Sequence, residues 1–198
     1  MFRFALLAML MFSGLGLAGC STSDVHLAYN PSVSVSAGGP PSVAIVTAVD
    51  RRKEEPNRLA TIMGTFGNPI KILNTTSPVK DEVVSVFTKG LQARGLLGND
   101  GRAPFRVDLL IRKFDADMIM GSTARIDLDL TVVDTATGLP VYKDTVVDER
   151  SDFAVFAVGI FADIGDMQKL AQTVLDATVD HTLDKPAFRA AIARAPTS

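Results

Sequence analysis

Asp127 and Asp129 have a spacing that paired catalytic carboxylates could use. Positions i and i+2 of a strand point to the same face, so both carboxylates would lie side by side, as in glycoside hydrolysis. Arg106 and Arg112 fall on the matching face of the preceding predicted strand. Because cross-strand ion pairs explain this arrangement without a reaction, we interpret it as an exposed, charged sheet face.

The two histidines also have simpler interpretations than catalysis. His181 falls near the apolar stripe of the last predicted helix, where we expect it to be partly buried and hydrogen-bonded. A general base is the alternative for this residue. His26 lies in a segment rich in Ser, Gly and Pro, where we expect no rigid geometry to hold it for chemistry.

Composition and motifs exclude several classes of protein. The 198 residues include one Cys and two His and carry a net charge of −2, which argues against disulfides, a metal centre and nucleic-acid binding. The sequence lacks Gly-x-Ser-x-Gly, His-Glu-x-x-His and a phosphate-binding loop. We therefore expect a protein that is not an enzyme and that uses no catalytic residue, cofactor, metal or nucleic acid.

Residues 1–19 have the layout of a signal peptide. Arg3 precedes an uncharged apolar run, and small residues follow it up to Gly19. The segment is too short to remain as a membrane-spanning helix. The sequence Leu17-Ala18-Gly19-Cys20 resembles the lipobox of bacterial lipoproteins. That resemblance implies cleavage between Gly19 and Cys20, followed by acylation of Cys20 with palmitate-like chains.

Two alternatives to the lipobox stay open: a secreted protein with an incidental Cys, and a membrane anchor that is never cut. If Cys20 is acylated, each buried methylene contributes roughly 0.8 kcal/mol, so two or more chains anchor stably. Ser21 follows the cysteine, whereas Asp would resemble an inner-membrane retention signal. We therefore expect a lipid-anchored envelope protein, at the outer membrane and facing the periplasm.

The rest of the chain divides into a flexible tether at 20–41 and a single domain at 42–198. The tether is predicted from its Ser, Gly and Pro content. The domain begins with a β-prone run at 43–49, which we expect to be covered on both faces. Short strands follow at 59–63 and 70–73. Ser77-Pro78 is expected to cap a helix that stops at Arg94-Gly95, with Gly90 allowing close approach of this helix to the sheet.

Three alternating segments follow and predict an antiparallel meander with a turn at 135–138. A long helix is expected from Asp166 to about Lys185, and a short one from Pro186 to Ala193. This element order predicts an α+β fold: a mostly antiparallel sheet with two longer helices packed on one face.

An uncharged apolar segment at 153–161 contains three Phe residues and is too short to cross a bilayer. One interpretation is that the segment fills the core. The other is an exposed patch that docks a partner or the membrane surface. In that second case we expect the binding residues to include Phe153, Phe156, Ile160 and Phe161.

Over roughly residues 43–192 the chain resembles the YajG-like family of bacterial lipoproteins. The resemblance depends on fold residues: Leu91-Gln92-Ala93-Arg94-Gly95, Val107-Asp108-Leu109-Leu110-Ile111, Val174-Leu175-Asp176, Leu183-Asp184 and Phe188. It implies a lipoprotein and transfers no site residue, because the family is functionally uncharacterised. In element order the chain also looks like accessory lipoproteins of envelope transporters.

These observations predict a non-enzymatic, membrane-anchored periplasmic lipoprotein, with a structural or adaptor role toward an envelope protein. The alternative is a binding module with a pocket between helices and sheet for a lipid or other apolar ligand.

Overall fold

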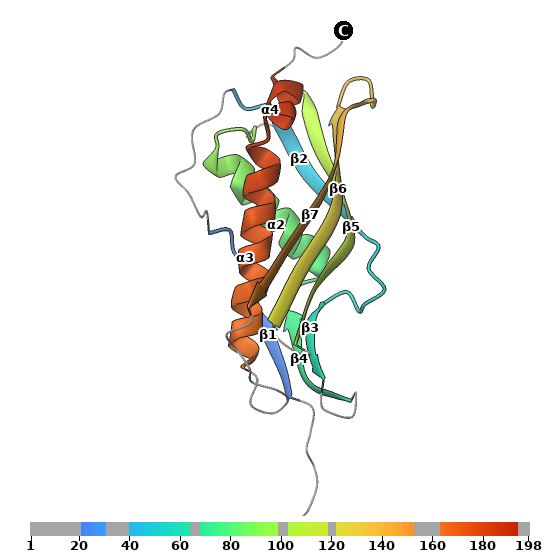
Figure 1. Cartoon of the computed structure of the whole chain (residues 1–198). Helices are drawn as coiled ribbons and strands as arrows, with labels where there is room; N and C mark the ends of the chain where they lie inside the picture. The colour runs from blue at the N-terminus through green and yellow to red at the C-terminus, as the bar shows by residue number, and fades with distance from the viewer. Residues whose placement is uncertain are drawn as a thin grey trace, which may run out of the picture.

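A computed structural model describes residues 21–30, 40–63, 68–98, 103–118, 122–152 and 163–193. Within these residues the chain forms seven strands and three helices (Figure 1). The strands are β1 (Ser21–Val25), β2 (Val43–Asp50), β3 (Arg58–Met63), β4 (Pro69–Thr75), β5 (Phe105–Met118), β6 (Ser122–Asp134) and β7 (Pro140–Asp152). The helices are α2 (Val79–Ala93), α3 (Ile164–Leu183) and α4 (Pro186–Ile192).

The sheet is mixed, which corrects the expectation of a mostly antiparallel sheet. Its strand order is β1-β4-β3-β5-β6-β7, and β2 also pairs with β5. The pairs β3–β4, β5–β6 and β6–β7 are antiparallel, whereas β1–β4, β2–β5 and β3–β5 are parallel. The parallel pairs join strands that are distant in sequence. For β2–β5 and β3–β5 the intervening chain includes α2, as the long connection between parallel strands requires.

The predicted meander of β5, β6 and β7 is present, and it contains a bulge. On β6, alternate residues from Ser122 to Val132 are buried, as the sequence pattern predicts. On β5 the register shifts between Ile111 and Lys113, so Arg112 is an extra residue and two consecutive side chains are exposed. The turn after β6 ends at Gly138, whose φ of 71° suits glycine.

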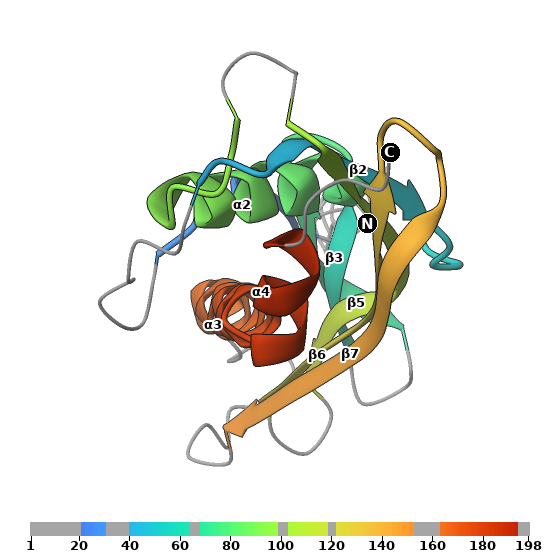
Figure 2. The same cartoon turned by 90° about the horizontal axis from the view of Figure 1, so that it is seen from above.

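Helices α2 and α3 cover one face of the sheet, as predicted, and α4 lies beside them (Figure 2). Their apolar stripes meet the inner face of the strands in one continuous core. Helix α2 ends at Ala93, with Gly95 at a φ of 68°, as expected for this stop. Its start differs from the prediction, because Pro78 is the N-cap and no side chain caps the helix.

Gly90 does permit a close approach, but toward a helix and not toward the sheet. A Cβ at this position would lie 2.5 Å from Cγ1 of Val179 and 3.1 Å from Cδ1 of Leu183, both on α3. The absence of a side chain therefore lets α2 and α3 cross in contact.

Residues 21–30 were expected to belong to the flexible tether, and the structure shows them as part of the fold. They form β1 and then cross the helix layer, where Leu27 is fully buried. Strand β2 differs too: it is not covered on both faces, because Ile45 and Val49 are exposed. Alternation of buried and exposed residues in β2 follows from its place on a sheet with one open face.

Several expected sites fall outside the described residues. These are the signal peptide, its cleavage site at Gly19, the lipidation site Cys20, and the apolar residues Phe153, Phe156, Ile160 and Phe161. No helix in the described part of the chain combines the length and apolar character needed to cross a membrane.

Candidate functional site

The most elaborate polar site in the described structure holds the N-terminal segment, residues 21–30, against the domain. Its first half is held by backbone pairing: β1 runs parallel to β4, from Ser21 opposite Lys71 to Val25 opposite Thr75. The amide of Thr76 donates to the carbonyl of Val25 at 2.8 Å. Beyond Val25 the segment leaves the sheet, and side chains of α2 and α3 replace a neighbouring strand.

Glu82 of α2 holds the first residues beyond the strand. Its side chain is 1% exposed and accepts hydrogen bonds from the amide of Leu27 at 3.2 Å and the hydroxyl of Thr76 at 3.2 Å. Nδ1 of His26 lies 2.9 Å from Oε2 of the same carboxylate. His26 is therefore held in a defined place, contrary to the expectation from sequence, although its ring remains largely exposed.

Gln172 and Asp176 of α3 hold the next residues through the backbone. The Gln172 side chain accepts from the amide of Ala28 at 3.0 Å and donates to the carbonyl of the same residue. One amide side chain thus satisfies both backbone groups, as a paired strand would. Asp176 accepts from the amide of Asn30 at 3.2 Å and from Nε2 of Gln172 at 2.9 Å.

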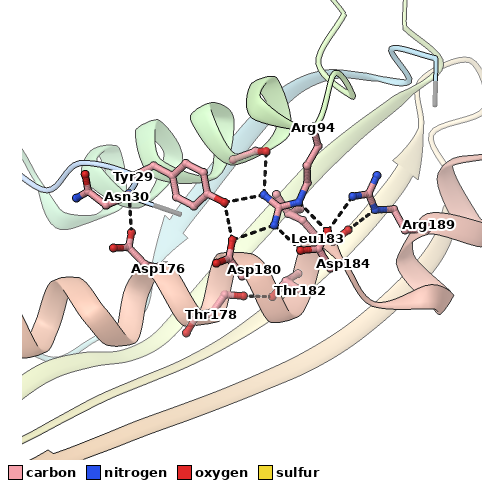
Figure 3. Close-up of polar contacts among 11 residues, drawn as sticks. Tyr29, Asn30, Arg94, Asp176, Thr178, Asp180, Thr182, Leu183, Asp184 and Arg189 are labelled. Carbon is pink, nitrogen blue, oxygen red and sulfur yellow. Dashed lines mark hydrogen bonds and ion pairs between the residues drawn. The ribbon is translucent and has the colours of Figure 1, made fainter. Parts of the chain in front are cut away.

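Tyr29 enters a buried charged cluster centred on Arg94 (Figure 3). Arg94 is 0% exposed, and its guanidinium donates to Tyr29 Oη at 2.7 Å, to Asp180 at 2.9 Å and to Asp184 at 2.5 and 2.8 Å. It also donates to the carbonyl of Gly90 at 3.1 Å. Tyr29 donates in turn to Asp180 at 2.5 Å, and Arg189 of α4 donates to Asp184 at 2.8 Å.

We call these five residues (Tyr29, Arg94, Asp180, Asp184 and Arg189) the Arg94 cluster. It joins four parts of the chain: the N-terminal segment, the end of α2, the end of α3 and α4. A buried guanidinium needs this many partners, because an unpaired charge in the core costs several kcal/mol. The cluster therefore fixes the N-terminal segment and both helix ends in one arrangement.

The cluster and its neighbours have shifted pKa values with identifiable causes. Burial lowers the pKa of Arg94, but hydrogen bonds to Asp184, Asp180 and Tyr29 outweigh it and leave the pKa raised. Burial and the hydrogen bond to Asp180 raise the pKa of Tyr29 to about 12. Hydrogen bonding from Arg94 lowers the pKa of Asp184 to about 2, whereas burial raises that of Asp176 to about 6. At neutral pH both carboxylates are therefore mainly ionised and Tyr29 keeps its proton.

This arrangement supports a structural role. Asp176, Asp180 and Asp184 recur every four residues along α3, but each is occupied by donors from the N-terminal segment, α2, α3 or α4. Within the described residues, no group of three or more His, Cys, Asp or Glu side chains could hold a metal ion. The site therefore binds a segment of the protein's own chain. We call the residues that hold positions 26–30 the seat: they are Glu82, Gln172, Asp176 and the Arg94 cluster.

The aspartate pair singled out from the sequence lies on the open face of the sheet, where Arg112 bridges it. The guanidinium lies 2.6 Å from Asp127 and 2.8 Å from Asp129. The bulge on β5 places Arg112 on this face, as expected, while Arg106 pairs with Asp108 on its own strand at 3.1 Å. The expected cross-strand ion pairs are therefore confirmed for Arg112. For Arg106 the expectation is wrong, because its partner lies on the same strand.

His181 pairs with Asp148 of β7 at 3.0 Å, so the expected hydrogen bond is present. Its side chain is 60% exposed, however, and not partly buried. The residue lies at the edge of α3 that faces β7, next to the ion pair between Lys185 and Asp144 at 2.7 Å. These two pairs link the helix layer to the last strand.

A hollow of about 560 Å³ lies on the open sheet face, and not between helices and sheet as the ligand-pocket alternative required. Its walls include Val49, Asp108, Leu110, Asp129 and Lys143. Among the described residues, the side chains of the core instead fill the space between the helices and the sheet. The mixed, partly ion-paired lining of the hollow does not favour an apolar ligand.

The residues of the seat were missed in the sequence, although a signal for them exists. Glu82 interrupts the buried face of α2 between Val79 and Val83, and Asp176 and Asp180 do the same on α3. A charged residue at a buried helical position needs a partner. That partner is a chain segment whose own alternation, Val25, Leu27 and Tyr29, is typical of a strand.

Together the fold and the seat define an α+β domain that holds its own N-terminal segment. No family model and no curated protein matches the chain. Among solved structures it is similar to a Xanthomonas campestris protein assigned to the DUF330 family model, at 11% identity and a TM-score of 0.60. That match covers 86% of this chain and 96% of the other, and it shows a shared fold.

The chain also has weaker structural similarity to two bacterial lipoproteins. One is a minor lipoprotein from Acinetobacter baumannii, at 15% identity and a TM-score of 0.39, covering 56% of this chain and 87% of the other. The second is lipoprotein GNA1162 from Neisseria meningitidis, at 11% identity and a TM-score of 0.30, covering 70% of this chain and 97% of the other. Both scores are too low to show a shared fold.

Proposed function

We propose that this protein is a non-enzymatic lipoprotein of the bacterial cell envelope, anchored through acyl chains on Cys20. The lipobox-like sequence supports the anchor. The observation that carries the proposal is the seat of the N-terminal segment: the residues after Cys20 are fixed to the domain by β1, Glu82, Gln172 and the Arg94 cluster. Such a site suits a protein whose N-terminus is attached to a membrane, because it fixes the attached end of the chain to the domain.

Metabolic labelling with a clickable palmitate analogue tests the anchor. Wild-type protein should take up label and sediment with membranes, and separation of the two membranes should place it at the outer one. Cys20→Ala should lose both the label and the membrane association. Thr22→Ala, an exposed position close by, serves as a matched control and should behave like wild type. Equal labelling of Cys20→Ala and wild type would refute the anchor.

The structural or adaptor role toward an envelope protein is the second part of the proposal, as is membership of the YajG-like family. We place the contact at Phe153, Phe156, Ile160 and Phe161 because this uncharged run begins directly after β7. Phe156→Asp should abolish cross-linking to the partner in cells while the protein stays folded and anchored. Leu139→Asp, at an exposed apolar residue of the β6–β7 turn, is the matched control. Unchanged cross-links in Phe156→Asp would remove this surface from consideration.

A further inference from the structure

One row of paired residues crosses the sheet from its first strand to its last. Ser21 of β1 pairs with Lys71, Lys71 with Ile62, and Ile62 with Met118. Met118 then pairs with Ser122, and Ser122 with Asp152. These six residues form one row of paired positions at the end of the sheet where β1 and β6 begin, and we call them the anchor rim.

No residue separates the anchor rim from the proposed lipid. Cys20 directly precedes Ser21, and consecutive Cα atoms are about 3.8 Å apart. Ser21 is already paired with Lys71, and the segment after it is held by the seat described above. The chain between acyl chains and folded domain therefore has almost no freedom, in contrast to a flexible tether of twenty residues, which would span roughly 25 Å.

The opposite end of the molecule lies far from this rim. Strand β6 runs from Ser122 in the rim to Asp134 over 13 residues. At a rise of about 3.3 Å per residue, the turn beyond Asp134 lies roughly 40 Å from the rim along the strand. Helix α4 lies at that far end as well (Figure 1).

We propose that the anchor rim contacts the headgroups of the membrane and that the strands stand upright on it, holding the β6–β7 turn away from the bilayer. This inference rests on the lipid anchor at Cys20. The rim contains Lys71, and exposed side chains within two positions of it on the strands include Asp117 and Arg150. Because charges of both signs are present, the acyl chains and the short connection, not charge, hold the rim in place.

The position of two fluorescent probes tests this orientation. In the lipidated protein, whose own Cys20 thiol is blocked, Ser151→Cys carries a probe beside the rim, and Ala136→Cys carries one on the far turn; both sites are exposed. The protein is reconstituted in vesicles of phosphatidylethanolamine and phosphatidylglycerol that contain a headgroup-spin-labelled lipid. We expect at least about twofold quenching at residue 151, none at residue 136, and little change at high salt.

A spacer variant separates the rigid connection from the anchor itself. Ten Gly and Ser residues inserted between Cys20 and Ser21 would give a mean reach of about 17 Å. This variant should still be labelled with palmitate and bind vesicles, but quenching at residue 151 should fall toward the level at residue 136. Vesicle binding and quenching are measured on the same preparation of the variant. Circular dichroism of that preparation shows whether the variant is folded.

The outcomes distinguish the two proposals. If the protein without the spacer is not acylated and does not bind vesicles, the lipid anchor is overturned. Normal acylation and binding with equal quenching at both probes, or with quenching at residue 136 alone, would overturn the orientation while leaving the anchor intact. Quenching at residue 151 that persists in the spacer variant would show that another surface, and not the short connection, holds the rim at the membrane.

Discussion

Tyr29 and Arg94 are joined by a hydrogen bond of 2.7 Å, although 65 positions separate them in sequence. The guanidinium carbon also lies 5.9 Å from the centre of the tyrosine ring. Arg94 is the C-cap of helix α2 and is completely buried, so this contact links the N-terminal segment to the interior of the helix layer. The N-terminal segment is thus fastened at its far end as well as at β1.

Replacing Arg94 with Met should lower the free energy of unfolding by about 3 kcal/mol or more, because Asp180 is left with a buried, poorly compensated charge. The measurement is urea unfolding of the non-lipidated Cys20→Ser chain. Arg112→Met is the matched control: it removes an arginine that also bridges two aspartates, but on the exposed sheet face. A loss for Arg94→Met no larger than that of Arg112→Met would contradict the importance of the cluster.

Tyr29→Phe should have a smaller and more local effect. The ring stays in place, while two hydrogen bonds are lost, at a cost of about 0.5–1.5 kcal/mol each. Because Arg94 and Asp180 still pair with each other at 2.9 Å, the helices should remain assembled. Amide hydrogen exchange should accelerate at Ala28 and Asn30 but not in the centre of α3. Uniform acceleration across the domain would show that Tyr29 supports the whole core.

Asp176 should make stability depend on pH between about 4 and 6. Its pKa is raised from 3.8 to about 6 in the folded protein, mainly by burial. The folded state therefore binds this proton more tightly, and the resulting stabilisation is fully present below pH 3.8 and lost as the pH rises through 6. Asp184 acts in the opposite sense: its contribution is present above pH 3.8 and lost as the pH falls through about 2.

Asp176→Asn should remove the first of these dependences. The amide oxygen of Asn can still accept from the backbone of Asn30 and from Gln172. Urea midpoints measured across this pH range should therefore change less in the variant than in the wild-type chain. Asp117→Asn, on the exposed side of β5, controls for a general effect of net charge. An unchanged pH profile in Asp176→Asn would assign the titration to another group.

Gly90→Ala should destabilise the protein although alanine favours helices by about 1 kcal/mol over glycine. The new methyl group would meet the branched side chain of Val179 at 2.5 Å, and such overpacking costs typically about 1–3 kcal/mol. The stability lost through Gly90→Ala should be smaller when Val179 is already alanine. We therefore expect a smaller difference between Gly90→Ala/Val179→Ala and Val179→Ala than between Gly90→Ala and the wild type. Additive effects in thermal unfolding would show that the two residues do not compete for this space.

The sequence predicted best those elements whose side chains alternate locally. The burial pattern of β6 and the stop at Gly95 follow from period and turn chemistry within a few residues. The bulge at Arg112 also has a local signal, because the buried set changes phase between Ile111 and Phe114. An interpretation that grouped only residues 105–111 could not detect that change.

Features that depend on distant parts of the chain were not predictable in the same way. The parallel pairing of β1 with β4 depends on which strand edge is free after the other strands assemble. Likewise the seat joins residues 26–30 to side chains that lie between 55 and 151 positions later in the sequence. The Ser and Gly content of 31–39 therefore dominated the interpretation of the whole segment 20–41, and the strand-like part was assigned to the tether.

The seat also sets an order of events for the newly made chain. Tyr29 reaches Asp180 across 151 positions, so the N-terminal segment can dock only after nearly the whole protein has been synthesised. Under the proposed cleavage and acylation of Cys20, the enzymes acting there need unpaired backbone on both sides of the bond, whereas docking pairs the very next residue. On that proposal, maturation of the N-terminus precedes the last step of folding, and a variant that docks early is processed slowly.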